Sequence, residues 1–224
     1  DQLDVWEIKP DGSSAVRLTN GSVDQVRHRI VRLDPEAEWI DRDVPLTVSQ
    51  FGLRSKKSGF ARVTASGAAS SVTSLVWMDK RVDRLVKARR ADRYAYVVQA
   101  FEDSPDYFVG DGTLGSAVKV SHTNPFMAEY SWGHATLIDY RSQTGQPLQG
   151  ALFFPANYQA GKRYPMVVYM YEKLTDGVHQ FSAPSEREYY NPAAFTTRGY
   201  FYLQPDIVFR PREPGQSVVE CVVP

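Results

Sequence analysis

Residues 163–171 read RYPMVVYMY and end in a nearly continuous run of apolar side chains. Such runs are typical of strands that are buried on both faces of a sheet. A second apolar run, YFYLQPD, covers residues 200–206, and residues 191–198 between the two runs predict a short helix that Gly199 ends. Two buried strands joined through a helix form the beginning of a mixed α/β domain.

The segments on either side of these runs fit the same kind of domain. Upstream, residues 136–140 and 148–154 predict two strands that are joined by a turn over Ser142–Pro147. Downstream, a loop over residues 211–216 precedes residues 217–223, which predict a further helix. We therefore expect an α/β part over residues 126–224.

The first 125 residues show a different pattern, in which apolar and polar residues alternate over short stretches. This period of two, with frequent Gly, Pro and Asp-Gly turns, predicts antiparallel strands joined by hairpins. The expected strands are 3–8, 15–19, 26–33, 46–51, 59–65, 72–78, 94–101, 106–109 and 117–121, with a turn of small residues at Gly67–Ser71. Residues 82–90 fit a helix and a strand equally well. Hairpins of this kind favour propeller blades or a sandwich.

The composition excludes several classes of function. The 26 basic and 26 acidic residues give a net charge of zero, so the chain has no overall field that would attract nucleic acid. The single Cys allows neither an internal disulfide nor a Cys-rich zinc site, and no two of the four His residues have a spacing that would place them on one helical turn. No apolar run approaches the ~20 residues that a membrane-spanning helix needs.

A set of short motifs is distributed over most of the chain. It comprises Trp132-Gly133, Leu137–Tyr140, Leu148–Gly150, Pro155–Tyr158, Gly161–Pro165, Gly199-Tyr200 and Gln204–Ile207, and nearer the N-terminus Asp4–Trp6, Asp11–Ser13 and Arg17–Thr19. These motifs resemble the prolyl oligopeptidase (S9) family of serine peptidases, and are most similar to its dipeptidyl-peptidase-like and acylaminoacyl-peptidase-like bacterial members.

The resemblance implies a mostly β chain followed by an α/β part. It implies the last blades of a β-propeller over residues 1–125, and the N-terminal part of an α/β-hydrolase domain over residues 126–224. The implied function is that of a serine peptidase that hydrolyses short peptides by acyl transfer, without a metal or organic cofactor.

The resemblance also gives one residue a chemical role. Tyr171, at the end of the first apolar run, is placed as a hydrogen-bond donor to the oxyanion of the reaction. Glu172-Lys173 follows it where many relatives have small residues. The alternative for Tyr171 is an aromatic side chain at the rim of the site with no chemical role.

The nucleophile of such an enzyme is expected to lie outside this sequence. α/β-Hydrolases carry it in a Gly-x-Ser-x-Gly turn, and no Ser here has Gly two positions before and two after. Gly215-Gln216-Ser217 has the first half, but Val219 stands in place of the second Gly. Ser217 is expected to be a helix N-cap and Cys221 a small buried side chain. We therefore expect a fragment that lacks the Ser-Asp-His triad and is inactive by itself.

Two other functions stay open from the sequence. One is a non-catalytic β-rich module that binds a partner through its aromatic residues, and the other is an esterase on the same hydrolase fold. The expected partners are a short peptide substrate and, since an unfinished sheet would expose an edge near Tyr200–Leu203, the remainder of the hydrolase domain or a second copy. The chain begins with Asp1, which indicates a processed chain or a fragment. We expect a periplasmic or secreted location rather than a cytoplasmic one.

Overall fold

The computed structural model describes residues 2–41, 43–66, 69–185 and 187–223. Strands dominate these residues and the helices are short, so the expectation of a mostly β chain is confirmed. No helix within the described ranges is long and apolar enough to cross a bilayer. The chain forms two compact units: the first comprises the described residues up to Gln99 together with Pro105–His122, and the second comprises Ala100–Ser104 together with those from Thr123 onward.

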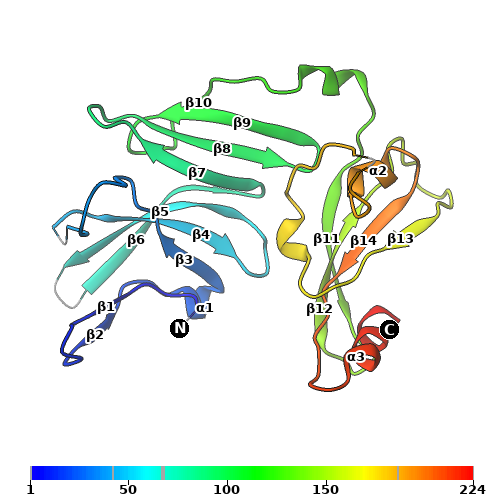
Figure 1. Cartoon of the computed structure of the whole chain (residues 1–224), viewed down its shortest axis with the longest axis horizontal. Coiled ribbons are helices and arrows are strands. Elements are labelled where there is room, and N and C mark those ends of the chain that lie inside the picture. Colours follow the sequence, from blue (N-terminus) through cyan, green and yellow to red (C-terminus); the bar gives the residue numbers. More distant parts are fainter. Residues whose placement is uncertain (1, 42, 67–68, 186, 224) are drawn as a thin grey trace. The chain divides into compact units, whose positions relative to one another are not determined.

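The first unit contains a hairpin, a short helix and two four-stranded sheets (Figure 1). The hairpin pairs β1 (Trp6–Ile8) with β2 (Ala15–Arg17), and α1 (Gly21–Asp24) follows it. One sheet has the order β3-β4-β5-β6 and the other the order β10-β9-β8-β7. Their bounds are β3 (Val26–Ile30), β4 (Leu46–Gly52), β5 (Ser58–Ser66), β6 (Ala69–Met78), β7 (Arg81–Lys87), β8 (Tyr94–Ala100), β9 (Asp103–Gly110) and β10 (Val118–Lys119). In both sheets, strands that follow one another in the sequence are neighbours, as in the blades of a propeller.

The hydrogen-bond ladders resolve one expectation for this unit, and a second lies partly outside the described residues. The ambiguous segment 82–90 begins as strand β7, which pairs with β8 and has an irregular register between Asp83 and Val86. Of the expected turn Gly67–Ser71, residues 67 and 68 lie outside the described residues, and residues 69–71 belong to β6.

The buried carboxylate of Asp4 ties the start of the first unit to helix α1. Its Oδ1 accepts hydrogen bonds from Thr19 Oγ1, at 2.7 Å, and from the Gly21 N–H, and its Oδ2 accepts one from the Ser22 N–H at 3.1 Å. Burial raises the pKa of Asp4, but the hydrogen bonds from Thr19, Gly21 and Ser22 outweigh burial, so the pKa lies below its usual value.

The second unit is built on one mixed sheet with the order β11-β12-β14-β13. The strands are β11 (Ala135–Arg141), β12 (Pro147–Phe153), β13 (Met166–Val168) and β14 (Phe201–Pro205). β12 pairs antiparallel with both β11 and β14, whereas β13 and β14 are parallel. The connection from β13 to β14 contains the single-turn 3₁₀ helix η2 (Thr175–Gly177) and helix α2 (Pro192–Thr196). Helix η1 (Pro125–Glu129) precedes the sheet and α3 (Pro214–Val222) follows it.

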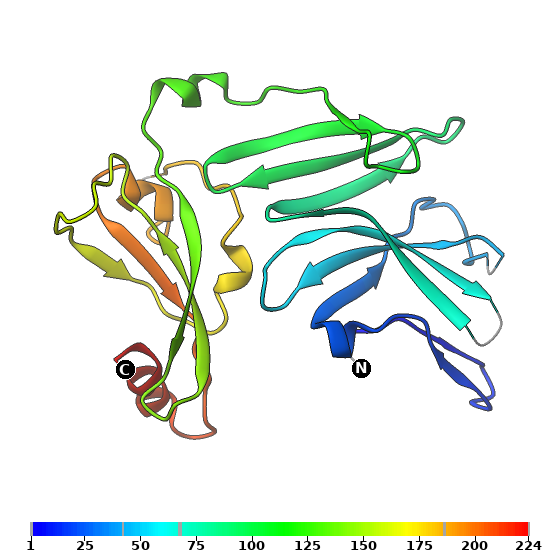
Figure 2. The ribbon, with the colours of Figure 1, turned by 180° about the vertical axis from the view of Figure 1, so that it is seen from behind.

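The two faces of this sheet are covered by different elements. Phe153 and Ala151 of β12 pack with Tyr202 and with Ala193 of α2, whereas Leu148 packs with Cys221 of α3. Because neighbouring residues of a strand face opposite ways, Leu148 lies on the other face from Ala151 and Phe153. Figure 2 shows β11 and β12 as a long twisted pair, with α3 against one end of it, where the Gln143 N–H donates to the Glu220 carbonyl.

Three expectations for this unit are wrong. The apolar run 163–171 is not a strand buried on both faces, because β13 covers only Met166–Val168 and stands last in the sheet order, with the Met166 side chain 48% exposed. Tyr200–Leu203 is not an open edge, because β14 lies between β12 and β13. Ser217 is not an N-cap, because α3 begins at Pro214 and Ser217 lies in its first turn.

Candidate functional site

The candidate site lies where the parallel strands β13 and β14 end. The carboxyl ends of parallel strands meet at one edge of a sheet, and loops at that edge commonly carry the functional side chains of α/β folds. The pairing of β13 with β14 stops at Val168 and Leu203, after which the Tyr169 N–H donates to the Leu203 carbonyl at 2.9 Å. The chain then enters a loop that contains Tyr171 and leads to η2 at Thr175.

The side chain of Tyr171 is 66% exposed on this loop. Within the described residues, its hydroxyl makes no hydrogen bond to the chain, so it has its donor available for another molecule. Its neighbour Tyr169 is different, because that ring packs against the apolar core of the second unit. The structure therefore separates the two tyrosines into one at the surface and one against the core.

Tyr169 belongs to a cluster of aromatic rings. It stacks on Tyr190 with the ring centroids 4.4 Å apart and an angle of 20° between the planes. The buried Tyr202 hydroxyl donates to the Tyr190 carbonyl at 3.0 Å, and so holds the backbone of one of the two stacked residues. Burial, with a smaller contribution from Tyr169, raises the pKa of Tyr202 to about 12, which keeps this hydroxyl protonated as a donor.

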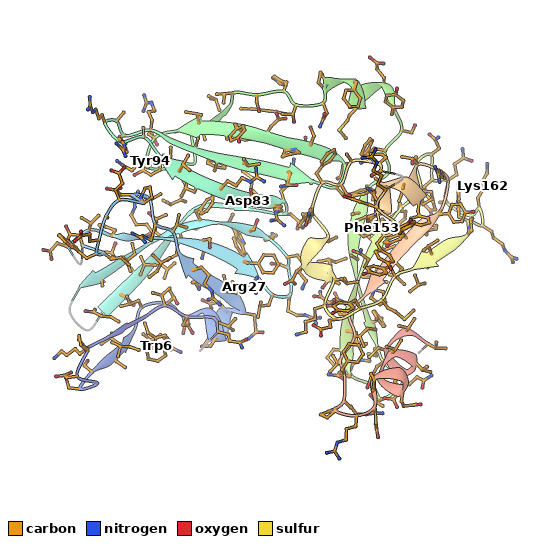
Figure 3. The ribbon with its side chains drawn as sticks, viewed as in Figure 1. Trp6, Arg27, Asp83, Tyr94, Phe153 and Lys162 are labelled. Carbon is orange, nitrogen blue, oxygen red and sulfur yellow. The ribbon has the colours of Figure 1, made fainter. Side chains whose placement is uncertain are left out.

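A layer of buried aromatic rings packs together with Tyr169 in the core of the second unit. Phe153, labelled in Figure 3, packs edge to face against Phe101, at 4.9 Å between the centroids, and against Tyr202 at 6.1 Å. All three side chains are almost completely buried. A close-packed layer of this kind has little freedom to move, and it holds β12 and β14 in place.

The carboxylate of Asp206, which directly follows β14, holds the far end of that loop. Its Oδ1 accepts hydrogen bonds from the N–H groups of Leu174, at 2.9 Å, and Thr175, at 3.1 Å. Its Oδ2 accepts a hydrogen bond of 2.6 Å from the Thr175 hydroxyl. Asp206 is 8% exposed and Thr175 is fully buried, so the two bonds from Thr175 are shielded from water, whereas the bond from Leu174 is partly buried.

Ser217 and Cys221 have structural roles in the second unit. The Ser217 hydroxyl donates to the Glu213 carbonyl at 2.7 Å and accepts a hydrogen bond from the Arg210 N–H at 3.0 Å. Cys221 is buried beside Leu148 and Ile207, as expected for a small apolar side chain. In the part of the chain that the structure describes, no group of three or more His, Cys, Asp or Glu residues is placed to hold a metal ion.

The sequence did not single out Asp206, Thr175 or Tyr190 as members of this edge. An acidic residue directly after an apolar strand is a usable signal for Asp206, since strand ends are where functional loops begin. Thr175 and Tyr190 lie in a connection without periodicity, and only the folded chain brings them to β13 and β14.

No protein-family model matches the chain, and the search of curated proteins gives no match. Several solved structures share its fold at low sequence identity. A dipeptidyl peptidase 4 from Porphyromonas gingivalis aligns with a TM-score of 0.62 at 12% identity, over 91% of this chain and 27% of its own. A putative dipeptidyl aminopeptidase IV from Bacteroides ovatus aligns with a TM-score of 0.60 at 15% identity, over 92% and 28%. An oligopeptidase B from Leishmania major aligns with a TM-score of 0.58 at 12% identity, over 88% and 26%.

These neighbours are peptidases by name, and the chain shares their fold. It spans 26–28% of the length of these solved structures.

Proposed function

We propose that these 224 residues are part of a serine peptidase of the prolyl oligopeptidase family that hydrolyses short peptides. The single observation that carries the proposal is the shared fold, which covers about nine-tenths of the chain and extends through both compact units. In this proposal, residues 1–125 are the last blades of a β-propeller and residues 126–224 are the beginning of an α/β-hydrolase domain. The Ser-Asp-His triad is provided by residues outside these 224, and no metal or organic cofactor takes part.

Tyr171 is the residue of this chain that we assign to the chemistry. When a serine attacks a peptide carbonyl, the carbonyl oxygen becomes an oxyanion, and a fixed donor aimed at it stabilises the transition state. The position of Tyr171 after a strand end and its exposed side chain support this role. Glu172 and Lys173, which follow Tyr171 on the same loop, are also exposed.

The proposal is tested with a fluorophosphonate probe, which labels the nucleophile of serine hydrolases. The full-length protein that contains this sequence is expected to be labelled at a Ser outside the 224 residues and to cleave short peptides. The 224-residue chain alone is expected to stay unlabelled and inactive. Labelling of Ser217 in the short chain would contradict the assignment of the nucleophile, and a full-length protein that cleaves simple esters but no peptide would favour an esterase.

A further inference from the structure

Tyr171 lies outside regular secondary structure, between the end of β13 at Val168 and the start of η2 at Thr175. A donor to an oxyanion is effective only when it is held in place before the reaction, because reorientation during the reaction costs free energy. The loop must therefore be fixed by contacts other than those of a strand. The structure shows which contacts these are.

Two backbone hydrogen bonds hold the loop near Tyr171. The Tyr169 N–H donates to the Leu203 carbonyl at 2.9 Å, and the Ile207 N–H donates to the Glu172 carbonyl at 2.8 Å. Both partners belong to β14 or to the residues just after it. These bonds hold the loop on either side of Tyr171, but they do not determine how it returns to η2.

The return of the loop depends on Asp206. One carboxylate receives the N–H groups of Leu174 and Thr175 and the hydroxyl of Thr175, all at 3.1 Å or less. The Asp206 N–H in turn donates to the Gln149 carbonyl of β12 at 2.8 Å, so the carboxylate is itself anchored to the middle of the sheet. Hydrogen bonds to a carboxylate are stronger than those between neutral groups, and burial protects the two bonds from Thr175 from competition by water.

We propose that Asp206 and Thr175 form a buried clamp that positions Tyr171 for its role at the oxyanion, an inference that rests on the proposed peptidase function. The clamp touches neither substrate nor the reacting atoms. It acts through the loop, by fixing the backbone that carries Tyr171 beyond the carboxyl end of β13.

The decisive experiment is a double-mutant cycle in the full-length protein, with Thr175→Val and Tyr171→Phe. Val has nearly the shape of Thr and deletes the hydroxyl that reaches Asp206 Oδ2. We expect Thr175→Val to lower kcat about 10-fold with KM unchanged, since small displacements of a positioned group reduce rate strongly. In the Tyr171→Phe background, Thr175→Val should have almost no further effect on kcat. In the otherwise unmutated protein, Thr175→Ser keeps the hydroxyl and should retain most of the activity.

Ser217→Ala is the matched control, because Ser217 is also a buried hydroxyl of the second unit with two hydrogen bonds. It should lower the melting temperature without a change in kcat. An equal loss of kcat from Thr175→Val with and without the Tyr171 hydroxyl would overturn the clamp, because the effect would then not pass through Tyr171. An unchanged kcat in Thr175→Val would overturn it as well.

A second measurement separates failure of the clamp from failure of the peptidase assignment. With 3-fluorotyrosine incorporated, ¹⁹F NMR reports the surroundings of Tyr171, whose signal is assigned by its loss in Tyr171→Phe. For Tyr171 we expect one narrow signal in the unmutated protein. This signal should shift or broaden after Thr175→Val but not after Ser217→Ala. A Tyr171 signal that stays unchanged after Thr175→Val refutes the clamp, whatever reaction the protein catalyses. A signal that responds, in a protein without peptidase activity, supports the clamp and refutes the function.

Discussion

Replacement of Tyr171 by Phe in the full-length protein removes one hydroxyl and leaves the ring in place. If this hydroxyl donates to the oxyanion, its loss should affect the transition state far more than the bound substrate. We therefore expect kcat to fall while KM stays nearly constant, which is the signature of an interaction made only in the transition state.

The expected magnitude follows from the surroundings of the side chain. Loss of one donor to an oxyanion typically costs about 3–4 kcal/mol, or about 10²–10³ in kcat. The Tyr171 side chain is 66% exposed, so the same substitution should change the free energy of unfolding by less than about 0.5 kcal/mol. A large loss of rate with intact stability is therefore the predicted combination.

Two other tyrosines of the second unit provide controls. Tyr169→Phe keeps the ring that stacks on Tyr190, and Tyr189→Phe alters a side chain that is 84% exposed. Both should change kcat by less than about threefold, well under the loss expected for an oxyanion donor. The assay is steady-state hydrolysis of a short chromogenic peptide, with stability followed by urea unfolding. Small and equal effects of all three substitutions would refute the role of Tyr171, and a large rise in KM with kcat intact would move it to substrate binding.

Three further predictions concern the stability and association of the 224-residue chain. Asp4→Asn should lower the free energy of unfolding by about 1–2 kcal/mol at pH 7. Because folding lowers the pKa of Asp4, this difference should be lost as the pH falls through that lowered pKa. Equal differences at pH 7 and pH 3 in urea unfolding would contradict the prediction. Phe153→Ala should cost about 3–5 kcal/mol by emptying a buried site, measurable by the same method. Met166→Lys should reduce self-association in sedimentation experiments by placing a charge on β13, the last strand of its sheet. If the 224-residue chain without this substitution is already a monomer, β13 does not pair with a second copy.

The hairpins of the first unit could be predicted from local pattern, because the alternation of apolar and polar residues and the turn residues act over a few positions. The pair β4 and β5 and the pair β1 and β2 were found in this way. Segment 82–90 could not be resolved, because its Val and Leu spacing fits both periods. Only pairing with β8 decides it, and pairing depends on residues further along the chain.

The second unit shows where local pattern fails. The apolar runs at 163–171 and 200–206 look equally buried, yet β14 is central and β13 is last in the order, because the crossover through α2 places β13 on the outer side. Apolar content does not encode that order. Tyr171 follows from a family resemblance. Asp206 has a local signal, because it is an acidic residue directly after an apolar strand, whereas Thr175 has none, because its contact with Asp206 forms only when two loops meet.

The division of the chain into units has a consequence for how the protein is made. The second unit takes Ala100–Ser104 from a stretch that is synthesised before the rest of it, and Phe101 from that stretch is buried at 1% exposure against Phe153. During synthesis, at about 5–20 residues per second, the apolar ring of Phe101 stays exposed until β12 and β14 have left the ribosome and can cover it. A protein truncated to begin at Thr123 would lack this ring, so a boundary drawn along the sequence alone would remove part of the core it was meant to preserve.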